Sequence, residues 1–422
     1  MDFIHIKDVL DGKHTGKEVL LRGWVYRKRE QKDIVFLMLR DSTGVIQLTC
    51  KEIKEAERAT IESSIEVAGL VKEDKRAPGG FEIEVRDLKI IGLAERFPIS
   101  KDLSEEFLRD VRHLWIRSQK LTKILKIRSE VFYAIHEFFR KEGYIQFHSP
   151  SIISAACEGG STLFEIKYFD KKAYLTQSWQ LYAEAGIQAL EKIYTIAPSF
   201  RAEKSRTVRH LAEYWHAEAE AAWMDMEECM KLAEDLICFV CKKIAERCAD
   251  ELKFFKKDLK DLIIEPPFEK ISYDKVIEIL KKKGFDIKWG DDLGADEEKA
   301  LVEGYKKPII VYGYPTMCKA FYHMPDSKNP KITKSFDVIA PYVGELVGGG
   351  QRIHDKEQLI KKIKDFGLDP KEYDWYIDLR RYGTIPHSGF GLGIERFIMW
   401  ITGVEHIMDT IPFPRTQTRV YP

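Results

Sequence analysis

The sequence predicts an α+β protein, in which a small N-terminal β-barrel precedes a larger domain with an antiparallel sheet flanked by helices. Three observations support this prediction. Short β-rich runs of alternating hydrophobicity fill the first 97 residues, and a strong amphipathic helical pattern begins only after residue 118. Beyond it, β-like segments recur between helices without regular βαβ alternation. A chain of 422 residues is long enough for two or three domains.

The barrel is predicted from five strand-like runs in residues 1–97. These are VLLRGWVYR, IVFLMLR, VIQLTC, IEVAGLVKE and FEIEVRDLKIIGLA, with turns at DSTG and RAPGG. Five short strands in about 80 residues favour a closed barrel of the OB type, which binds oligonucleotides in many proteins. A generic β-barrel or sandwich without a ligand is the alternative. Polar residues 98–118 are expected to form a hinge.

The second domain is expected over residues 119–422. Apolar residues at helical spacing predict a helix from Leu121 to Gly143, a second over Met226–Cys248, and a last one near Gly393. Charged residues 282–307 are interpreted as a solvated insertion.

Composition excludes a surface uniformly coated with positive charge, because 68 basic residues balance 68 acidic ones. Two local basic clusters remain, one from Arg22 to Lys32 and one from Arg201 to His210. No apolar run approaches the roughly 20 residues of a membrane helix, and MDFIHIKDVL lacks a signal-peptide profile. We therefore expect a cytoplasmic protein that does not span a membrane.

Four cysteines cluster in LAEDLICFVCKKIAERC and just before it: Cys229, Cys238, Cys241 and Cys248. Helical periodicity through this segment favours reduced cysteines buried on an apolar helix face. A zinc site is the less favoured alternative.

Three segments carry residues suited to phosphate chemistry. Arg201, Arg209 and His210 surround a strand–loop–strand that could clamp phosphates, although an ion-paired hairpin tip fits equally well. Glu345 precedes three glycines, an arrangement that suits Mg²⁺ bound beside a phosphate or a plain Gly-rich turn. GFGLG leads into a helix that begins with Glu395 and Arg396, where an arginine could cover an aromatic base.

Together, the order of these motifs resembles class II aminoacyl-tRNA synthetases: a long helix, then FRAE…RHLAEYW, then GLGIER. An N-terminal OB barrel is the layout of the aspartyl/asparaginyl/lysyl subgroup. The segments EGGSTLF, QSWQLY, GGGQR and RRYGTIPHSGFGLGIERF look closest to archaeal-type asparaginyl enzymes. The resemblance implies that ATP and L-asparagine form an adenylate with Mg²⁺ present. The asparaginyl group would then pass to the 3′ end of tRNA(Asn).

The resemblance also implies roles for individual residues. The expected catalytic residues are Arg201, Glu203 and Arg396. The expected ATP contacts are Arg201, Glu203, Arg209, His210, Leu211, Tyr214, Glu345, Gly393, Ile394, Glu395 and Arg396, with Tyr214 and Arg396 on either side of the adenine. The expected asparagine contacts are Glu158, Gln180, Arg201, Glu218, Gly348 and Arg352. Glu345 and Asp337 are the expected Mg²⁺ ligands, although Gly348 replaces a serine usual in aspartyl enzymes.

Amino-acid choice depends on Ala183, because aspartyl enzymes carry a lysine there that pairs with the substrate carboxylate. Arg380 also fits the asparaginyl pattern. An aspartyl enzyme that charges both tRNAs is the first alternative. A paralogue that makes asparagine is the second, and a non-catalytic RNA-binding module is the third.

Two further expectations concern macromolecular partners. On the barrel, Phe36 and Gln47 match the family positions that contact the central anticodon base, and Arg27, Lys28 and Arg29 would hold phosphates. Residues 124–150 match the family's homodimer interface. A helix buried within its own chain is the alternative for this segment.

Overall fold

A computed structural model describes the chain except for residues 1, 101–102, 158–161 and 204–208. It divides into two compact units, Met1–Leu108 and Arg109–Pro422, which we describe separately. The division lies within the expected hinge, residues 98–118. This segment contains two short helices, α3 (Glu105–Asp110) and α4 (Arg112–Trp115).

The first unit is a closed five-stranded barrel with strand order β1-β2-β3-β5-β4, as the sequence predicted. Alternation explains it: Val35, Leu37 and Leu39 point inward from one strand while Phe36 and Met38 remain partly exposed. The barrel closes through a parallel contact between β3 and β5. The strands are β1 (Glu18–Gln31), β2 (Ile34–Arg40), β3 (Val45–Lys51), β4 (Ser64–Glu73) and β5 (Phe81–Gly92), with short helices α1 (Ile6–Leu10) and α2 (Lys54–Arg58).

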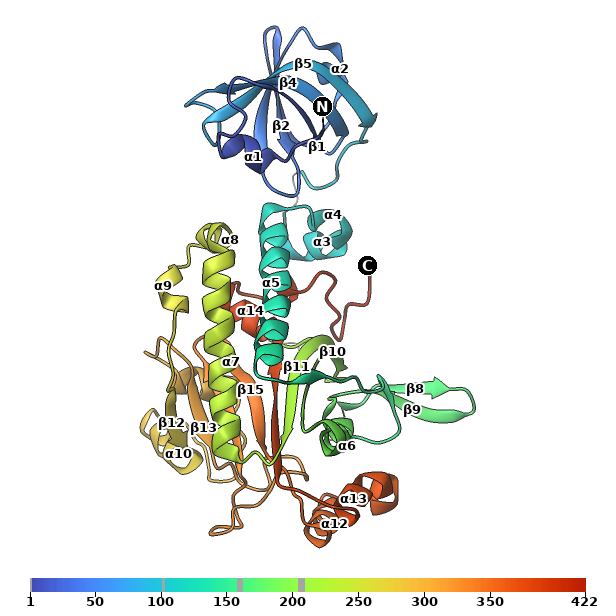
Figure 1. The fold of residues 1–422 in the computed structure, drawn as a ribbon, viewed down its shortest axis with the longest axis vertical. Helices are drawn as coiled ribbons and strands as arrows, with labels where there is room; N and C mark the ends of the chain where they lie inside the picture. Colours follow the sequence, from blue (N-terminus) through green and yellow to red (C-terminus); the bar gives the residue numbers. More distant parts are fainter. Residues whose placement is uncertain (1, 101–102, 158–161, 204–208) are drawn as a thin grey trace. The chain divides into compact units, whose positions relative to one another are not determined.

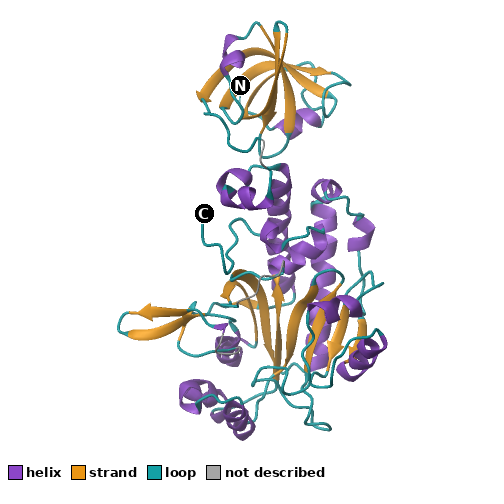
Figure 2. Cartoon of the chain, turned by 180° about the vertical axis from the view of Figure 1, so that it is seen from behind, coloured by secondary structure: helices purple, strands orange, loops and turns teal. Residues whose placement is uncertain are grey.

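The second unit contains an eight-stranded sheet of order β12-β13-β14-β15-β16-β11-β10-β6, drawn in Figures 1 and 2. Its central pairs are antiparallel, and only the β12–β13 and β10–β6 pairs near the edges are parallel. The strands are β6 (Ile145–Gln146), β10 (Lys192–Phe200), β11 (Glu213–Ala222), β12 (Glu269–Ser272), β13 (Ile309–Tyr312), β14 (Ser335–Ala340), β15 (Gly344–Gln351) and β16 (His387–Gly393). A small separate sheet has the order β7 (Ile152–Ile153), β9 (Lys171–Leu175), β8 (Glu165–Tyr168).

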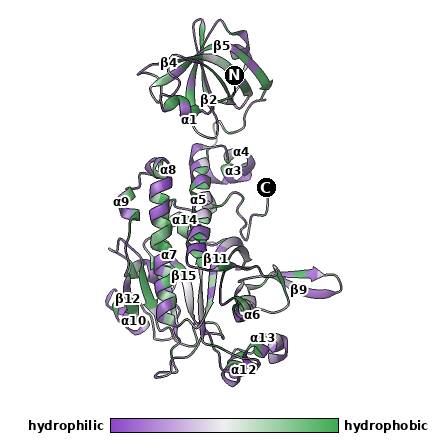
Figure 3. Ribbon diagram, in the orientation of Figure 1, coloured by the Kyte–Doolittle hydropathy of each residue, from purple (hydrophilic) through white to green (hydrophobic). Residues whose placement is uncertain are grey.

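Helices α5 (Gln119–Lys141) and α7 (Met226–Arg247) lie together on one face of this sheet, as the two opposite views show. Ser118 caps α5 by accepting from the Leu121 N–H, and a capping box of Asp225 and Glu228 begins α7. Figure 3 shows hydrophobic and hydrophilic residues side by side along α7. The other helices are α6 (Gln180–Leu190), α8 (Ala249–Phe254), α9 (Leu259–Leu262), α10 (Tyr273–Lys282), α11 (Ala295–Leu301), α12 (Lys356–Asp365), α13 (Asp374–Arg381) and α14 (Ile394–Thr402).

Strand β11 shows how the sequence separates core from site. In WHAEAEAA, Ala217, Ala219 and Ala221 enter the large core cluster that also contains residues of α5 and α7. Because side chains alternate along a strand, the intervening Glu218 and Glu220 face the opposite side of the sheet, where they line a cavity. Alanines that pack into the core therefore alternate with glutamates that face the cavity, so the acidic side chains are held by a strand whose other face is buried.

The helix α7 carries buried thiols, as predicted. Cys229, Cys241 and Cys248 are buried and Cys238 is half-buried, and none of the seven cysteines, all of which the structure describes, forms a disulfide. Burial raises the pKa of Cys238 and Cys248 to about 12, which keeps these thiols protonated. Among the described residues, no helix is long and apolar enough to cross a membrane.

One sequence expectation needs correction. Residues 282–307 are not simply solvated, because Ile287, Leu301 and Val302 enter a hydrophobic cluster with residues of α10 and β13. Charged neighbours concealed an apolar face that the chain covers itself. The apolar stripe of α5, which the sequence predicted, is buried within the same chain against α7, and the expected homodimer contact stays a prediction.

Candidate active site

Two adjoining cavities open on the face of the sheet opposite α5 and α7. The first has a volume of about 400 Å³ and the second about 70 Å³. Arg201, His216, Glu345 and Gly391 line both cavities, so these residues mark their junction. A reaction between a ligand in one cavity and a ligand in the other would take place beside Arg201.

The first cavity contains every described residue that the sequence predicts for asparagine. Gln180, Arg201, Glu218, Gly348 and Arg352 all line it, whereas Glu158 lies outside the described residues.

Local hydrogen bonds fix the acidic groups of this cavity. Ser178 Oγ and the Trp179 N–H donate to Glu218 at 2.5 and 3.0 Å. Arg352 donates to both carboxylate oxygens of Glu220 at 3.1 and 3.0 Å. The bidentate pair neutralises Arg352 while holding its guanidinium at the cavity wall.

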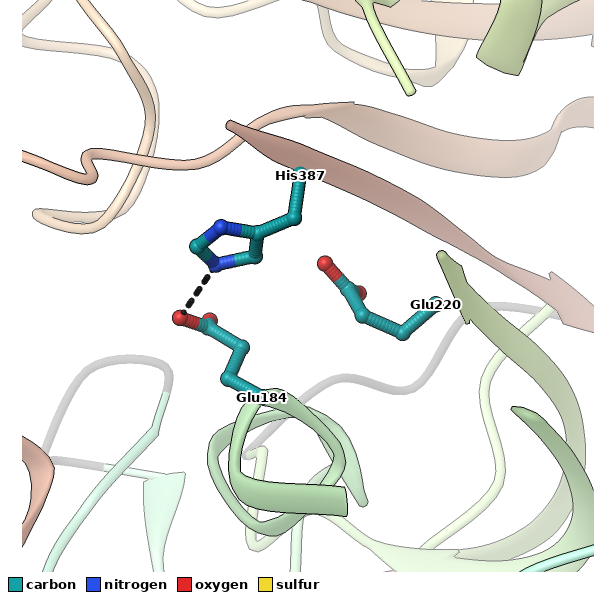
Figure 4. Close-up of side chains that lie close together, drawn as sticks. All are labelled: Glu184, Glu220 and His387. Atoms are coloured by element: carbon teal, nitrogen blue, oxygen red, sulfur yellow. Dashed lines mark hydrogen bonds and ion pairs between the residues drawn. The ribbon is translucent and has the colours of Figure 1, made fainter. Parts of the chain in front are cut away.

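A buried ion network adjoins the cavity, and Figure 4 shows three of its members, Glu184, Glu220 and His387. Glu184 of α6 accepts from His387 Nε2 at 2.9 Å and from the Tyr376 hydroxyl at 2.7 Å, and it pairs with Arg380. Burial opposes ionisation of Glu184, but Arg380 and His387 hold its pKa below the ordinary value. Glu184, Glu220 and His387 lie close enough to bind a metal, yet each carboxylate already has a bound arginine. We interpret this cluster as a structural ion network.

The second cavity contains ten of the eleven residues predicted for ATP. The exception is Ile394, which is fully buried at the start of α14. The Arg201 guanidinium lies 5.5 Å from the centre of the Tyr214 ring. Arg396 Nη1 donates to the Glu345 carbonyl at 2.9 Å, and Arg396 Nη2 lies 3.4 Å from His210 Nε2. Cations and one aromatic ring therefore share a small space, which suits a nucleotide.

Glu395 lines this cavity, and its carboxylate is also bound by other groups of the chain. Its carboxylate accepts from Arg128 of α5 at 2.6 Å and from the Trp215 N–H at 2.9 Å. These bonds tie α14 to α5 and β11. We therefore expect Glu395 to fix the position of its neighbour Arg396 rather than to contact a nucleotide.

His216, at the junction, is a neutral group. Burial and the nearby Arg201 and Arg396 lower its pKa to about 3. Its ring can therefore exchange hydrogen bonds without adding charge between the two cavities.

Comparison with known proteins agrees with this geometry. A family model described as tRNA synthetases class II (D, K and N) matches residues 104–417, and an OB-fold nucleic acid binding domain model matches residues 19–91. The chain belongs to the class II tRNA synthetases of this group. The resemblance predicted from the motifs is confirmed.

Full-length relatives show which members of this group the synthetase is similar to. It is 48% identical to an asparagine–tRNA ligase of Thermococcus gammatolerans, with all of both chains covered, and 46% identical to that of Pyrococcus furiosus over 96% of each. A crystal structure of asparaginyl-tRNA synthetase from Pyrococcus horikoshii complexed with asparaginyl-adenylate matches with a TM-score of 0.96 and 45% identity, covering both chains completely.

The synthetase has an oxygen-rich position suited to Mg²⁺ beside Gly348. A Cβ built on this glycine would lie 2.9 Å from Glu345 Oε1 and 3.5 Å from Asp337 Oδ1, so the two predicted ligands flank it. Asp337 also contacts Lys319 Nζ at 2.6 Å. Burial, offset in part by Lys319, raises the pKa of Asp337 to about 6. Two carboxylates at one glycine fit the oxygen donors that Mg²⁺ prefers.

Sequence reasoning missed several residues of the synthetase's first cavity. Lys319, Tyr322 and His323 line it from the segment TMCKAFYHMP, for which the sequence predicted no contact with a substrate. A lysine and a histidine beside aromatics were the available signal. Asp292, inside the supposed insertion, also lines this cavity.

Arg27, Arg29, Phe36 and Gln47 share the outer surface of the barrel, whereas Lys28 is paired with the buried Leu37 and donates to the Glu57 carbonyl at 2.6 Å. Arg29 and Phe36 are paired between β1 and β2, and the Arg29 guanidinium lies 4.9 Å from the Phe36 ring centre. Gln47 on β3 donates to Glu82 at 3.0 Å. Lys28 contacts Glu30 at 2.8 Å, and Arg27 lies over Tyr26. An aromatic ring and cations on one barrel face suit stacking of unpaired bases.

Proposed function

We propose that this synthetase is an asparaginyl-tRNA synthetase, which activates L-asparagine with ATP and transfers it to the 3′ end of tRNA(Asn). The observation that carries the proposal is the charge pattern of the first cavity. Glu218 can accept a hydrogen bond from an amide NH₂, whereas an aspartate carboxylate would meet a like charge there.

The cations of this cavity support the same substrate. Arg352 is already neutralised by Glu220, and Lys319 is paired with Asp337. Ala183, where aspartyl enzymes have a lysine, is fully buried in an apolar cluster. A carboxylate brought into this cavity would lose its hydration without gaining a dedicated partner, which costs several kcal/mol.

In the first reaction, the asparagine carboxylate oxygen attacks the α-phosphorus of ATP while the bond to the bridging oxygen breaks. Pyrophosphate leaves, and the asparaginyl group becomes joined to AMP. Arg201, at the junction of both cavities, would bind the α-phosphate and stabilise its developing negative charge. Tyr214 and Arg396 would hold the adenine between them.

The remaining groups would orient the triphosphate. Arg209 offers a cation to its outer oxygens, and His210 offers a neutral ring, because burial and the nearby Arg396 lower the pKa of this histidine. Glu345 and Asp337 would hold Mg²⁺, which supplies positive charge to the phosphates. Because no protein group forms a covalent bond in this reaction, positioning and charge account for the catalysis.

In the second reaction, a hydroxyl of the terminal tRNA adenosine attacks the activated carbonyl and AMP leaves. Phe36 and Gln47 would select the anticodon, and Arg27, Lys28 and Arg29 would hold its phosphates. The presence of a complete barrel favours a tRNA-charging enzyme over the asparagine-producing paralogue, which lacks an anticodon domain.

We also propose that the synthetase is a cytoplasmic homodimer through residues 124–150. The apolar stripe of α5 is buried within the chain, so the contact would use the other side chains of this segment. Tyr133 and Ile145 remain exposed by 58% and 47%, and β6 is an edge strand of the sheet. Such exposed apolar groups on a sheet edge suit a two-fold contact.

The test is ATP–pyrophosphate exchange with the purified chain and each of the twenty amino acids. Asparagine should support exchange, with aspartate at least about 100-fold weaker. The variant Glu218→Gln should lose most asparagine-dependent exchange, while Glu213→Gln, also on β11, should retain it. A preference for aspartate in the unchanged chain would contradict the proposed substrate.

A further inference from the structure

The charged segment 282–307 reaches the active site at two positions. Asp292 lines the first cavity, beside the loop that carries Lys319. Glu298, on α11, lies 3.5 Å from Arg209, which lines the second. Apolar residues of the same segment anchor it in a hydrophobic cluster. The segment is therefore attached to the catalytic unit and borders both substrate cavities.

The pair of Glu298 and Arg209 occupies a site shaped for it. Their side chains are only 13% and 14% exposed. Both lie against Gly344, where an added Cβ would be 2.1 Å from Glu298 Oε2 and 2.6 Å from Arg209 Nη1. Gly344 has φ +78°, so a glycine is favoured here for its backbone conformation as well as for space. Arg209 Nη1 also donates to the Val343 carbonyl at 3.0 Å.

The location of Arg209 indicates which part of ATP it faces. Arg201 lines both cavities, so the reacting α-phosphate belongs beside it. Arg209 lines the second cavity but not the first. It therefore faces a part of the nucleotide other than the reacting α-phosphate, and because a guanidinium pairs with anionic oxygens, the outer phosphates suit it better than the adenine does.

Arg209 also has room to move away from this position. A further cavity of about 530 Å³ lies on its other side, lined in addition by Lys257, Lys299 and Tyr342. A long arginine side chain next to open space loses rotamer freedom when it is held in one place. Glu298 and the Val343 carbonyl hold the guanidinium toward Gly344 and limit this movement.

We infer that Glu298 is a positioning residue for ATP, which orients Arg209 toward the outer phosphates. The inference rests on the proposed activation of an amino acid by ATP. It gives segment 282–307 a function in the reaction, although its sequence indicated only a charged surface. Burial and the neighbouring Glu345 raise the pKa of Glu298 to about 7, as is common for acidic groups in functional sites.

The test compares Glu298→Gln with Glu303→Gln, which removes an exposed carboxylate from the same segment. Glu303 pairs with Lys283 at 3.0 Å and has a 77% exposed side chain. In ATP–pyrophosphate exchange, Glu298→Gln should raise the KM for ATP about tenfold, the effect of one charge-assisted contact. The KM for asparagine and the melting temperature should stay near those of the unchanged chain, and Glu303→Gln should match it in every measurement.

A binding titration without amino acid gives a second measurement. Affinity for ATP should fall about tenfold in Glu298→Gln, whereas affinity for AMP should not change, because AMP lacks the outer phosphates. Glu298→Asp, which keeps the charge but withdraws it by one methylene, should give intermediate ATP affinity. It also provides the comparison if Glu298→Gln does not fold.

Equal losses of ATP and AMP affinity, or equal rises in both KM values, would overturn the inference by indicating general damage to the site. Unchanged ATP affinity in both Glu298 variants would also overturn it. An absence of asparagine-dependent exchange in the unchanged chain would instead contradict the proposed function. The two failures are therefore distinguishable.

Discussion

The barrel and the catalytic unit use charged residues in opposite ways. On the barrel, Arg27, Lys28 and Arg29 lie near the surface, against aromatic rings or an exposed carboxylate. In the catalytic unit, charges are buried in pairs that face or support the cavities. These pairs are Arg352–Glu220, Arg380–Glu184, Arg128–Glu395 and Lys319–Asp337. A chain without net charge thus contains both a solvated surface for binding and a fixed electrostatic site.

This difference follows from what each unit must do. A surface that binds and releases RNA gains from exposed cations, because their contacts with phosphates are adjustable and sensitive to salt. A site that stabilises a charged transition state gains from groups already oriented before the substrate arrives. Buried ion pairs add little to folding stability after desolvation is subtracted, so orientation is the better explanation for their number.

The largest expected effect comes from Arg201, the cation at the junction of the cavities. Arg201→Ala should lower ATP–pyrophosphate exchange by about 1,000-fold or more, because the charge that develops at the α-phosphate loses its closest cation. Circular dichroism and the melting temperature should remain near those of the unchanged chain. A loss below about tenfold would place the reacting phosphate elsewhere.

The fold could be predicted from sequence because its signals are local. Alternation along IVFLMLR predicted β2, and the spacing of apolar residues predicted α5 and α7. The sequence also predicted that Arg201, Tyr214 and Arg396 lie close together. This prediction rested on the order of the family motifs, because motifs that recur in a family mark positions that the fold brings together.

The ion pairs could not be predicted because their partners are distant in the chain. Glu220 and Arg352 are 132 residues apart, and Glu184 and Arg380 are 196 apart. No periodicity links such residues. The function proposed for Glu298 could not be predicted for the same reason. Its partner Arg209 belongs to another element, and the residues next to Glu298 in the sequence are mostly charged.

A smaller effect should distinguish the function of the barrel from that of the catalytic unit. Phe36→Ala should reduce charging of tRNA(Asn) about tenfold to 100-fold, the loss of one stacked base, while exchange stays within about twofold. Trp24→Ala is the matched control, because this barrel tryptophan is 46% exposed and lies outside the expected anticodon residues. Equal losses of charging and exchange would mean that the barrel is not a separate RNA-binding unit.

The smallest effect concerns stability and pH, and it applies to the catalytic unit. The folded state lowers the pKa of His216 to about 3, whereas an unfolded histidine has a pKa of about 6.5. The unfolded chain therefore binds the extra proton between these values, and the contribution of neutral His216 to stability is lost as the pH falls below 6.5. At pH 5.5 this linkage amounts to about 1.4 kcal/mol relative to neutral pH.

Several carboxyl groups of the catalytic unit act in the opposite direction, Asp337 and Glu298 among them. The raised pKa values of Asp337 and Glu298 make protonation favour the folded state, so the pH profile of the whole unit is a sum of opposing effects. The measurement is therefore a difference between variants. On moving from pH 7.5 to 5.5, the unchanged chain should lose about 1.4 kcal/mol more unfolding free energy than His216→Gln.

Urea unfolding followed by tryptophan fluorescence suits this test, because seven of the eight tryptophans lie in the catalytic unit. The control His14→Gln, on the barrel, should follow the profile of the unchanged chain. Parallel profiles for His216→Gln and the unchanged chain would mean that His216 has the same pKa in the folded and unfolded states. The junction between the two cavities would then gain a positive charge below about pH 6.5, and Arg201 would not act there alone.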